Sequence, residues 1–154
     1  MGIKDRLAQD LIQALRARDS QRKLAIRMLR AAIINEEKAG ESQRELTEDE
    51  ILGVISRQVR QRRESIEAYQ AGGRQDLVDE ETAQLNILLE YLPKQMSREE
   101  IVVAAEQAIS EVAATGPKDM GQVMRCLMPR LKGRADGRTV NQVVRELLAG
   151  AAEE

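Results

Sequence analysis

Apolar residues recur at every third or fourth position along almost the whole chain, which is the spacing that places them on one face of an α-helix. The first segment shows the pattern in its simplest form, with apolar side chains at Ile3, Leu7, Leu11 and Leu15. No run alternates β-branched or aromatic residues with polar ones between hairpin turns, as a strand would. The sequence therefore predicts an all-α protein built from seven helical segments.

Polar residues at the predicted helix starts support this division. Thr47 followed by Glu50 is a capping box, in which each side chain bonds the backbone amide of the other residue. Ser97 followed by Glu100 is a second capping box. Asp119 precedes another apolar run, and its carboxylate is expected to cap that helix. Local capping chemistry thus predicts where three of the helices begin.

Pro93 separates the fourth helical segment from the fifth. Proline disfavours helix at the preceding residue and has no amide to donate, so a helix should end here. We place a domain boundary at this point. The prediction is an N-terminal helical domain over residues 1–93 and a three-helix C-terminal domain over residues 94–154.

The composition of the chain excludes several kinds of active site. It contains no His, Trp or Phe, a single Cys and two Tyr. Without His there is no Ser–His or Cys–His pair and no imidazole metal ligand, and one thiol cannot form a clustered zinc site. We therefore predict no catalytic residue, no metal and no cofactor. Cys126 is expected to be structural, and Tyr69 and Tyr91 are expected to pack with their hydroxyls at the surface.

The distribution of apolar residues also bears on location. No stretch approaches the roughly 18 consecutive apolar residues that a membrane-spanning helix needs. The first residues enter a charged helical pattern at once, without the apolar core of a secretory signal. The expectation from the sequence is a cytoplasmic protein with no membrane partner.

Charge is uneven along the chain although the net charge is only −2. Residues 1–38 have a surplus of +4, from nine basic and five acidic groups, and residues 39–93 a deficit of −6, from six and twelve. Residues 118–138 hold six basic residues against two acidic ones, a local surplus of +4. Charge alone leaves phosphate binding and simple solvation equally open for this segment.

A second basic run lies in the third helical segment. It contains Arg57, Arg60, Arg62 and Arg63, with Glu64 and Glu67 at helical spacing. Phosphate binding is one interpretation of this run. A solvated, salt-bridged helix face is the favoured one, because such charge runs are common on helices.

Four stretches of the sequence stand out as motifs. They are residues 66–77, 89–97 (with Tyr91-Leu92-Pro93), 119–124 and 132–137 (Lys-Gly-Arg-Ala-Asp-Gly) followed by Val140-Asn141. Together they resemble the YqeY-like family. These are small bacterial proteins related to the C-terminal tail of GatB, a subunit of the tRNA-dependent amidotransferase that makes Gln-tRNA or Asn-tRNA. The resemblance implies an N-terminal helical bundle and a three-helix, tail-like C-terminal domain.

The resemblance also implies a function, because the related tail helps to hold the body of the tRNA. It favours RNA contact by the basic segment, through backbone and shape recognition without base stacking. The glycines there would let the backbone approach a phosphate closely. The expected RNA-binding residues are Lys118, Arg125, Arg130, Lys132, Gly133, Arg134, Gly137 and Arg138.

Three functions remain open at this stage. The leading one is an accessory, non-catalytic protein that contacts tRNA, or proteins of aminoacyl-tRNA synthesis or of the amidotransferase. The second is a helical protein–protein adaptor that docks through its N-terminal helices. The third is a component of a carbon–nitrogen ligase with glutamine as amido-N-donor, a label the family resemblance implies although the chain presents no catalytic groups of its own.

Overall fold

The computed structural model describes residues 2–153, and side chains up to residue 150. Within that range the chain forms seven α-helices, one short 3-10 helix and no strand, so the prediction of an all-α fold is confirmed. The helices are α1 (Ile3–Ala17), α2 (Ser20–Lys38), α3 (Glu48–Ala71), α4 (Gln75–Leu89), α5 (Arg98–Glu111), η1 (Pro117–Asp119), α6 (Met120–Leu131) and α7 (Gly137–Glu153).

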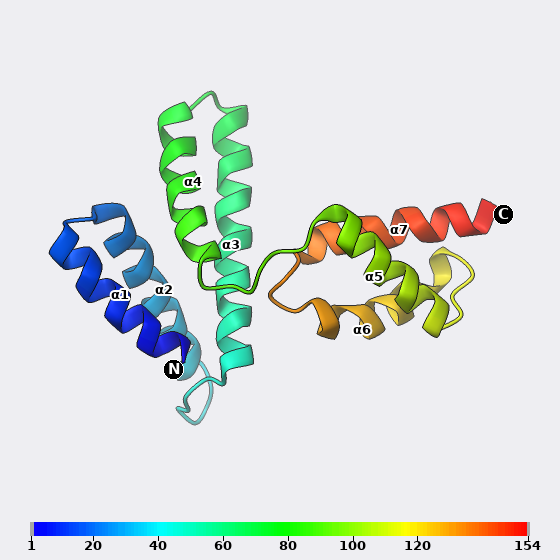
Figure 1. The fold of residues 1–154 in the computed structure, drawn as a ribbon, viewed down its shortest axis with the longest axis horizontal. Coiled ribbons are helices and arrows are strands. Elements are labelled where there is room, and N and C mark those ends of the chain that lie inside the picture. The colour runs from blue at the N-terminus through cyan, green and yellow to red at the C-terminus, as the bar shows by residue number, and fades with distance from the viewer. Residues whose placement is uncertain (1, 154) are drawn as a thin grey trace. The chain divides into compact units, whose positions relative to one another are not determined.

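The chain divides into two compact units, Met1–Pro93 and Lys94–Glu154. In the N-terminal unit α3 and α4 form a long antiparallel hairpin, and α1 and α2 form a second one (Figure 1). Gly73 closes the turn between α3 and α4 with φ of 70°, a backbone conformation that glycine adopts without strain. The two hairpins enclose one apolar core, whose fully buried side chains include Leu7, Ile26, Leu29 and Ile55.

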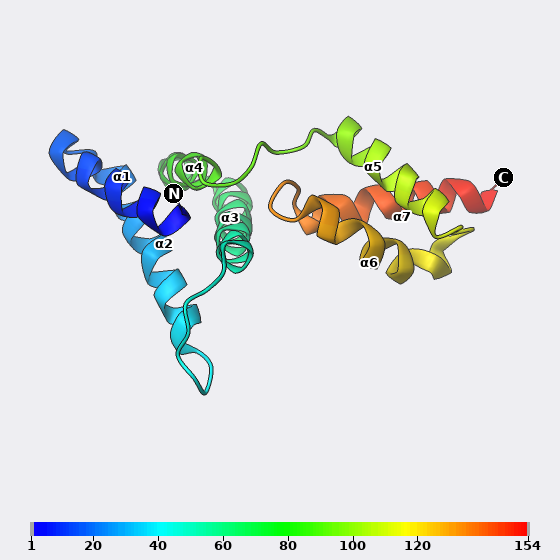
Figure 2. The same cartoon turned by 60° about the horizontal axis from the view of Figure 1, so that its bottom comes forward.

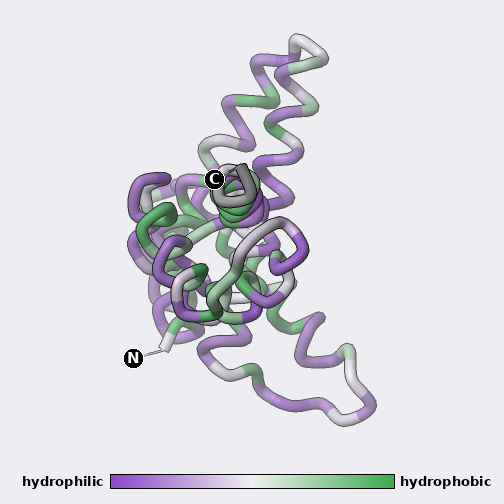
Figure 3. Tube along the Cα trace, turned by 90° about the vertical axis from the view of Figure 1, so that its right-hand side faces the viewer, coloured by the Kyte–Doolittle hydropathy of each residue, from purple (hydrophilic) through white to green (hydrophobic). Residues whose placement is uncertain are grey.

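The C-terminal unit is a bundle of α5, α6 and α7, seen from a second direction in Figure 2. Its core is entirely aliphatic, since residues 94–154 contain no aromatic side chain. Apolar and polar stretches alternate along the helices of the chain (Figure 3). The core of this bundle includes Ala105, Val123, Leu127, Val144 and Leu148.

The capping predictions are confirmed at two of three positions. The Thr47 and Ser97 hydroxyls each accept a hydrogen bond from the amide of the glutamate three residues on, at 3.2 Å. Asp119 behaves differently, because a turn of 3-10 helix precedes α6. Its carboxylate accepts from the backbone amide of Thr115 at 2.9 Å and makes no capping bond to α6.

Tyr91 also differs from expectation, because its hydroxyl is not at the surface. The ring is buried, and the hydroxyl donates a hydrogen bond to the Asp10 carboxylate on α1. The Arg6 guanidinium lies over the ring, 5.0 Å from its centre, and donates to the Glu90 carbonyl at 3.3 Å. Burial, followed by the bond to Asp10, raises the pKa of Tyr91. The residues after α4 are thereby held against α1.

Candidate nucleic-acid interface

The basic side chains predicted to contact RNA all lie on the surface of the C-terminal unit. They come from η1, from α6, from the turn that follows it and from the first turn of α7. Every one of the six is exposed, namely Lys118, Arg125, Arg130, Lys132, Arg134 and Arg138. The structure therefore brings the cations of this segment to solvent, although it does not use them all in the same way.

Three of them lie in or next to α6, and we call this set the α6 stripe, composed of Lys118, Arg125 and Lys132. Lys118 lies in η1, Arg125 within α6 and Lys132 directly after its last residue, and all three are exposed. The face of α6 that carries Val123 and Leu127 is fully buried in the core of the unit. The bundle thus fixes Arg125 outward, because turning α6 over would expose its apolar face.

Few acidic groups lie in the segment that carries the α6 stripe. Asp119 is the single carboxylate among residues 118–132. It accepts backbone amide bonds, chiefly from Thr115, which keep its pKa below the ordinary range. It therefore stays ionised at neutral pH beside Lys118. Arg125 and Lys132 form no ion pair with any side chain that the structure describes.

Arg130 lies to one side of the α6 stripe and already has a partner. Its guanidinium forms a two-point ion pair with the Glu111 carboxylate on α5, one contact being 3.2 Å. That pair raises the pKa of Arg130 and lowers the pKa of Glu111. The Cys126 thiol lies 3.6 Å from the same carboxylate, consistent with its expected structural role. An exposed pair of this kind is weak, so a phosphate can compete with Glu111 for Arg130.

The glycine turn has a different role from the one predicted. Gly133 is buried, with φ of 77°, and its carbonyl accepts a hydrogen bond from the Gln95 side chain at 2.8 Å. The Arg134 carbonyl accepts from the Met96 amide at 2.8 Å. Gly133 thus shapes the turn and ties it to the segment before α5, and it lies too deep to approach a phosphate. Gly137, the first residue of α7, is half-buried.

The arginine run on α3 fits the favoured interpretation, a solvated and salt-bridged face, at Arg57 but not at Arg62. Arg62 is only 8% exposed, and its Nε donates to the Gln84 Oε1 atom at 3.2 Å and lies 3.5 Å from the Glu81 carboxylate, both on α4. Its far end reaches the Met28 sulfur on α2 at 3.7 Å. Arg57 pairs with Glu36 at 3.4 Å. Arg62 is therefore an internal link between three helices.

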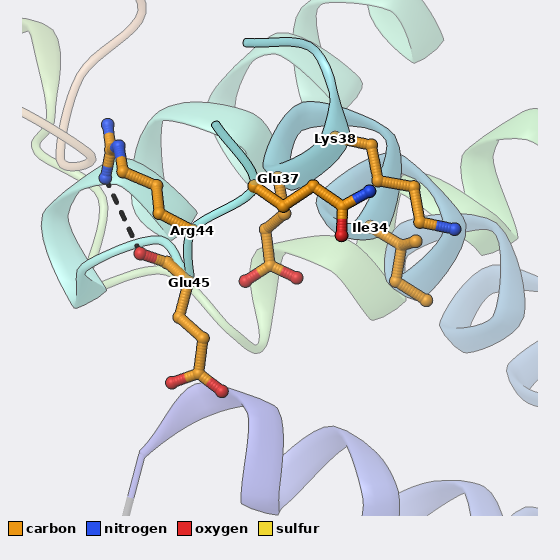
Figure 4. Close-up of a pocket in the computed structure, with 6 residues that line it drawn as sticks. Ile34, Glu37, Lys38, Arg44 and Glu45 are labelled. Atoms are coloured by element: carbon orange, nitrogen blue, oxygen red, sulfur yellow. Dashed lines mark hydrogen bonds between the residues drawn. The ribbon is translucent and has the colours of Figure 1, made fainter. Parts of the chain in front are cut away.

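The N-terminal unit has a small hollow at the end of α2, shown in Figure 4. Its volume is about 250 Å³, below the usual range for ligand pockets. Two of its charged groups are already bonded: Glu37 pairs with Lys4 and accepts from the Leu46 amide, and Arg44 binds Glu50. The Arg44 contact lowers the pKa of Glu50 to about 2. We assign this hollow no ligand.

In the described part of the chain, no helix combines the length and the apolar character that crossing a bilayer requires. Among the same residues, no three His, Cys, Asp or Glu side chains converge closely enough to hold a metal ion.

The chain is similar to a known protein family and to several curated proteins. A family model described as "Yqey-like protein" matches residues 4–148. Similar curated proteins include "Altered inheritance of mitochondria protein 41, mitochondrial" from Pyrenophora tritici-repentis, 32% identical over 95% of this chain and 81% of the relative. The proteins of the same name from Eremothecium gossypii and Saccharomyces cerevisiae are 33% and 35% identical, over 71% and 56% of this chain.

Two features of these matches bear on this chain, namely the share of each relative that it covers and the location given in their names. The chain spans 60% of the Eremothecium relative and 46% of the Saccharomyces one. All three relatives are named as mitochondrial proteins. That finding contradicts the expectation of a cytoplasmic location, which had rested on the absence of a signal pattern in the first residues.

Proposed function

Because the chain belongs to the YqeY-like family, we propose that it is an accessory helical protein that contacts tRNA through the C-terminal unit. The observation that carries the proposal is the α6 stripe, three exposed cations of which Arg125 and Lys132 form no ion pair with any side chain that the structure describes. The resemblance of this unit to the tail of GatB supports tRNA as the polyanion. The proposal assigns no chemical step to this chain.

The mode of contact follows from the side chains that the unit offers. Residues 94–154 contain no aromatic ring on which a base could stack. Lys and Arg can still neutralise backbone phosphates, which recognises the shape of a folded RNA rather than its sequence. With a net charge of −2 on the whole chain, the binding should be weak and should fall steeply with salt. Within the α6 stripe, Arg125 and Lys132 are the residues best placed to act.

The test is a titration of the full chain with tRNA at several salt concentrations. The variant Arg125→Glu/Lys132→Glu should weaken binding by about tenfold or more and make the plot of log K against log salt shallower by about 1.5, since each lost phosphate contact removes 0.7 to 0.9. The matched control is Arg27→Glu/Arg30→Glu on α2, which makes the same charge change in the other unit. If both double variants bind tRNA equally, the α6 stripe is not the site.

A second candidate function, a helical protein–protein adaptor, is favoured by a separate observation. Large apolar side chains remain exposed on the N-terminal hairpin, at Ile12 and Leu15 on α1 and at Leu24, Met28 and Ile34 on α2. Such apolar groups would not contribute to the binding of RNA phosphates, whereas a partner protein could bury them. Partner proteins of aminoacyl-tRNA synthesis or of the amidotransferase belong to this candidate.

A further inference from the structure

Helix α2 presents apolar side chains on two opposite faces. One face, with Ala25, Ile26, Leu29 and Ile33, is buried in the core of the N-terminal unit. The other carries Leu24, Met28 and Ile34, whose exposed fractions are 43%, 41% and 44%, together with exposed Ala31. These four positions follow one another at intervals of four, three and three residues, so they share one side of the helix. A helix that is apolar on both sides is normally covered on both.

Cations lie along the same outer side of α2. Arg27, Arg30 and Lys38 are exposed and stand at helical spacing from Met28, Ala31 and Ile34. None of the three cations forms an ion pair with any side chain that the structure describes. We call these three cations and the four apolar residues the α2 outer face.

The acidic residues among residues 1–38 bond groups other than the cations of the α2 outer face. The engagements are Asp5 with the Gly2 amide, Asp10 with Tyr91, Asp19 with the Arg22 amide, Glu36 with Arg57 and Glu37 with Lys4. Of these, Glu37 lines the same small hollow as Arg30 and Ile34. The face therefore combines half-exposed apolar groups with three cations that form no ion pair with a described side chain.

We propose that the α2 outer face binds an acidic amphipathic helix of a partner protein. This proposal rests on the adaptor candidate and names the chemistry of its partner. Apolar anchors at the observed spacing match the way one helix lies along another, and the cations call for Glu or Asp beside the partner's apolar stripe. From Leu24 to Lys38 the face is about 21 Å long, which fits a partner helix of about four turns.

The side chains favour this occupant over the other polyanions. RNA phosphates would meet the cations but would leave Leu24, Met28 and Ile34 in contact with water, without gain. A membrane-surface helix typically inserts bulky residues such as Trp or Phe, and this chain contains neither. Leucine, methionine and isoleucine that are less than half exposed lie low on the surface, where a second helix can pack against them.

The test uses the full chain with a photo-reactive residue in place of Ala31, irradiated in cells. Adducts are digested with nuclease and identified by mass spectrometry. A matched chain carries the same group in place of Gln107, an exposed neutral position on α5. The expected product is a protein adduct at position 31 whose attached segment has an apolar stripe flanked by Asp or Glu, absent from the chain modified at position 107.

Charge reversal makes the test specific. Arg27→Glu/Arg30→Glu should reduce the adduct at position 31 by about tenfold, because it places acids opposite the partner's acids. Arg125→Glu/Lys132→Glu should leave that adduct unchanged. Both pairs are exposed, so circular dichroism should report the same helix content for both variants. An adduct of RNA, lipid or a second copy of this chain would overturn the proposal, and so would an adduct insensitive to the α2 charges.

The two proposals fail separately. If tRNA binding does not depend on Arg125 and Lys132 while the acidic-helix adduct at position 31 persists, only the proposed RNA contact is refuted. A tRNA contact that depends on Arg125 and Lys132, without any acidic-helix adduct at position 31, would remove the adaptor and its partner alone.

Discussion

The two units of this chain differ in the polar side chains that they bury. In the N-terminal unit, Arg62 and Tyr91 are buried and bond polar side chains on other helices. In the C-terminal unit the core is aliphatic throughout, and the α6 stripe faces solvent. Buried polar groups fix a particular packing of helices but cost much when one partner is lost. Outward cations add little to folding and remain available to a partner.

The largest effect that tests this comparison is expected for Arg62→Ala. The substitution leaves the Gln84 amide and the Glu81 carboxylate without their cation in a seam where Arg62 was almost fully buried. We expect a loss of about 3 kcal/mol in the free energy of unfolding of the N-terminal unit. Urea unfolding followed by hydrogen exchange, resolved by mass spectrometry into the two units, measures it.

The control for this prediction lies on the same helix. Arg57→Ala removes an exposed pair with Glu36 and should cost less than about 0.5 kcal/mol. If the two variants lose equal free energy of unfolding, burial does not decide how much an arginine stabilises the N-terminal unit. The contrast between buried and exposed charge would then be wrong within that unit.

The next effect concerns Tyr91→Phe, which removes the bond to Asp10. The carboxylate is left partly buried without its donor, and we expect the N-terminal unit to lose about 1.5 kcal/mol. The C-terminal unit should be unaffected, and the same unit-resolved unfolding measures both.

The same residue predicts a pH dependence. The pKa of Tyr91 is raised in the folded chain above its ordinary value of 10, because burial and Asp10 favour the protonated hydroxyl. Its contribution is therefore complete below pH 10 and is lost as pH rises above that value. Alkaline titration of unfolding should show this loss in the parent chain and not in Tyr91→Phe. A variant that keeps the parent's alkaline profile would show that other groups cause it.

Much of this architecture could be predicted from the sequence, because it depends on local signals. The apolar period locates the helices, and the capping boxes at Thr47 and Ser97 act within three residues of each other. Arg62 is the opposite case. In the sequence it looks like its neighbours Arg60 and Arg63, and only the packing of α2 and α4 against α3 decides that it turns inward.

The candidate site shows the same limit. The exposure of Arg125 follows from the apolar period of α6, so it could be predicted from the sequence. The pairing of Arg130 with Glu111 and the burial of Gly133 depend on α5 and on the segment before it, which lie 19 and 38 residues away along the chain. No local pattern reports contacts of that separation, which is why the burial of Gly133 could not be predicted from the sequence.

A smaller effect compares the two capping boxes, one in each unit. Thr47→Ala and Ser97→Ala each remove a hydroxyl that accepts an amide at 3.2 Å. Each should cost about 1 kcal/mol, and only in its own unit. Unit-resolved hydrogen exchange measures this directly. If Ser97→Ala also lowers protection in α1 to α4, the two units do not unfold independently.

The smallest effect is a gain, expected at the ends of α1 and α5. Arg18 and Ala113 have φ of 56° and 54°, values that cost a residue with a β-carbon about 1 kcal/mol. Glycine relieves that strain but adds freedom to the unfolded chain, so Ala113→Gly should stabilise the C-terminal unit by about 0.5 kcal/mol. Arg18→Gly should do the same for the N-terminal unit, because the Arg18 side chain has no ion pair among the described residues. Thermal unfolding of the two variants makes the comparison, since a helix end of this kind is a backbone property and should respond alike in both units. A gain confined to Ala113→Gly would mean that the Arg18 charge stabilises the N-terminal unit through electrostatic attraction to nearby groups. An exposed cation would then contribute to folding, against the contrast between buried and exposed charge.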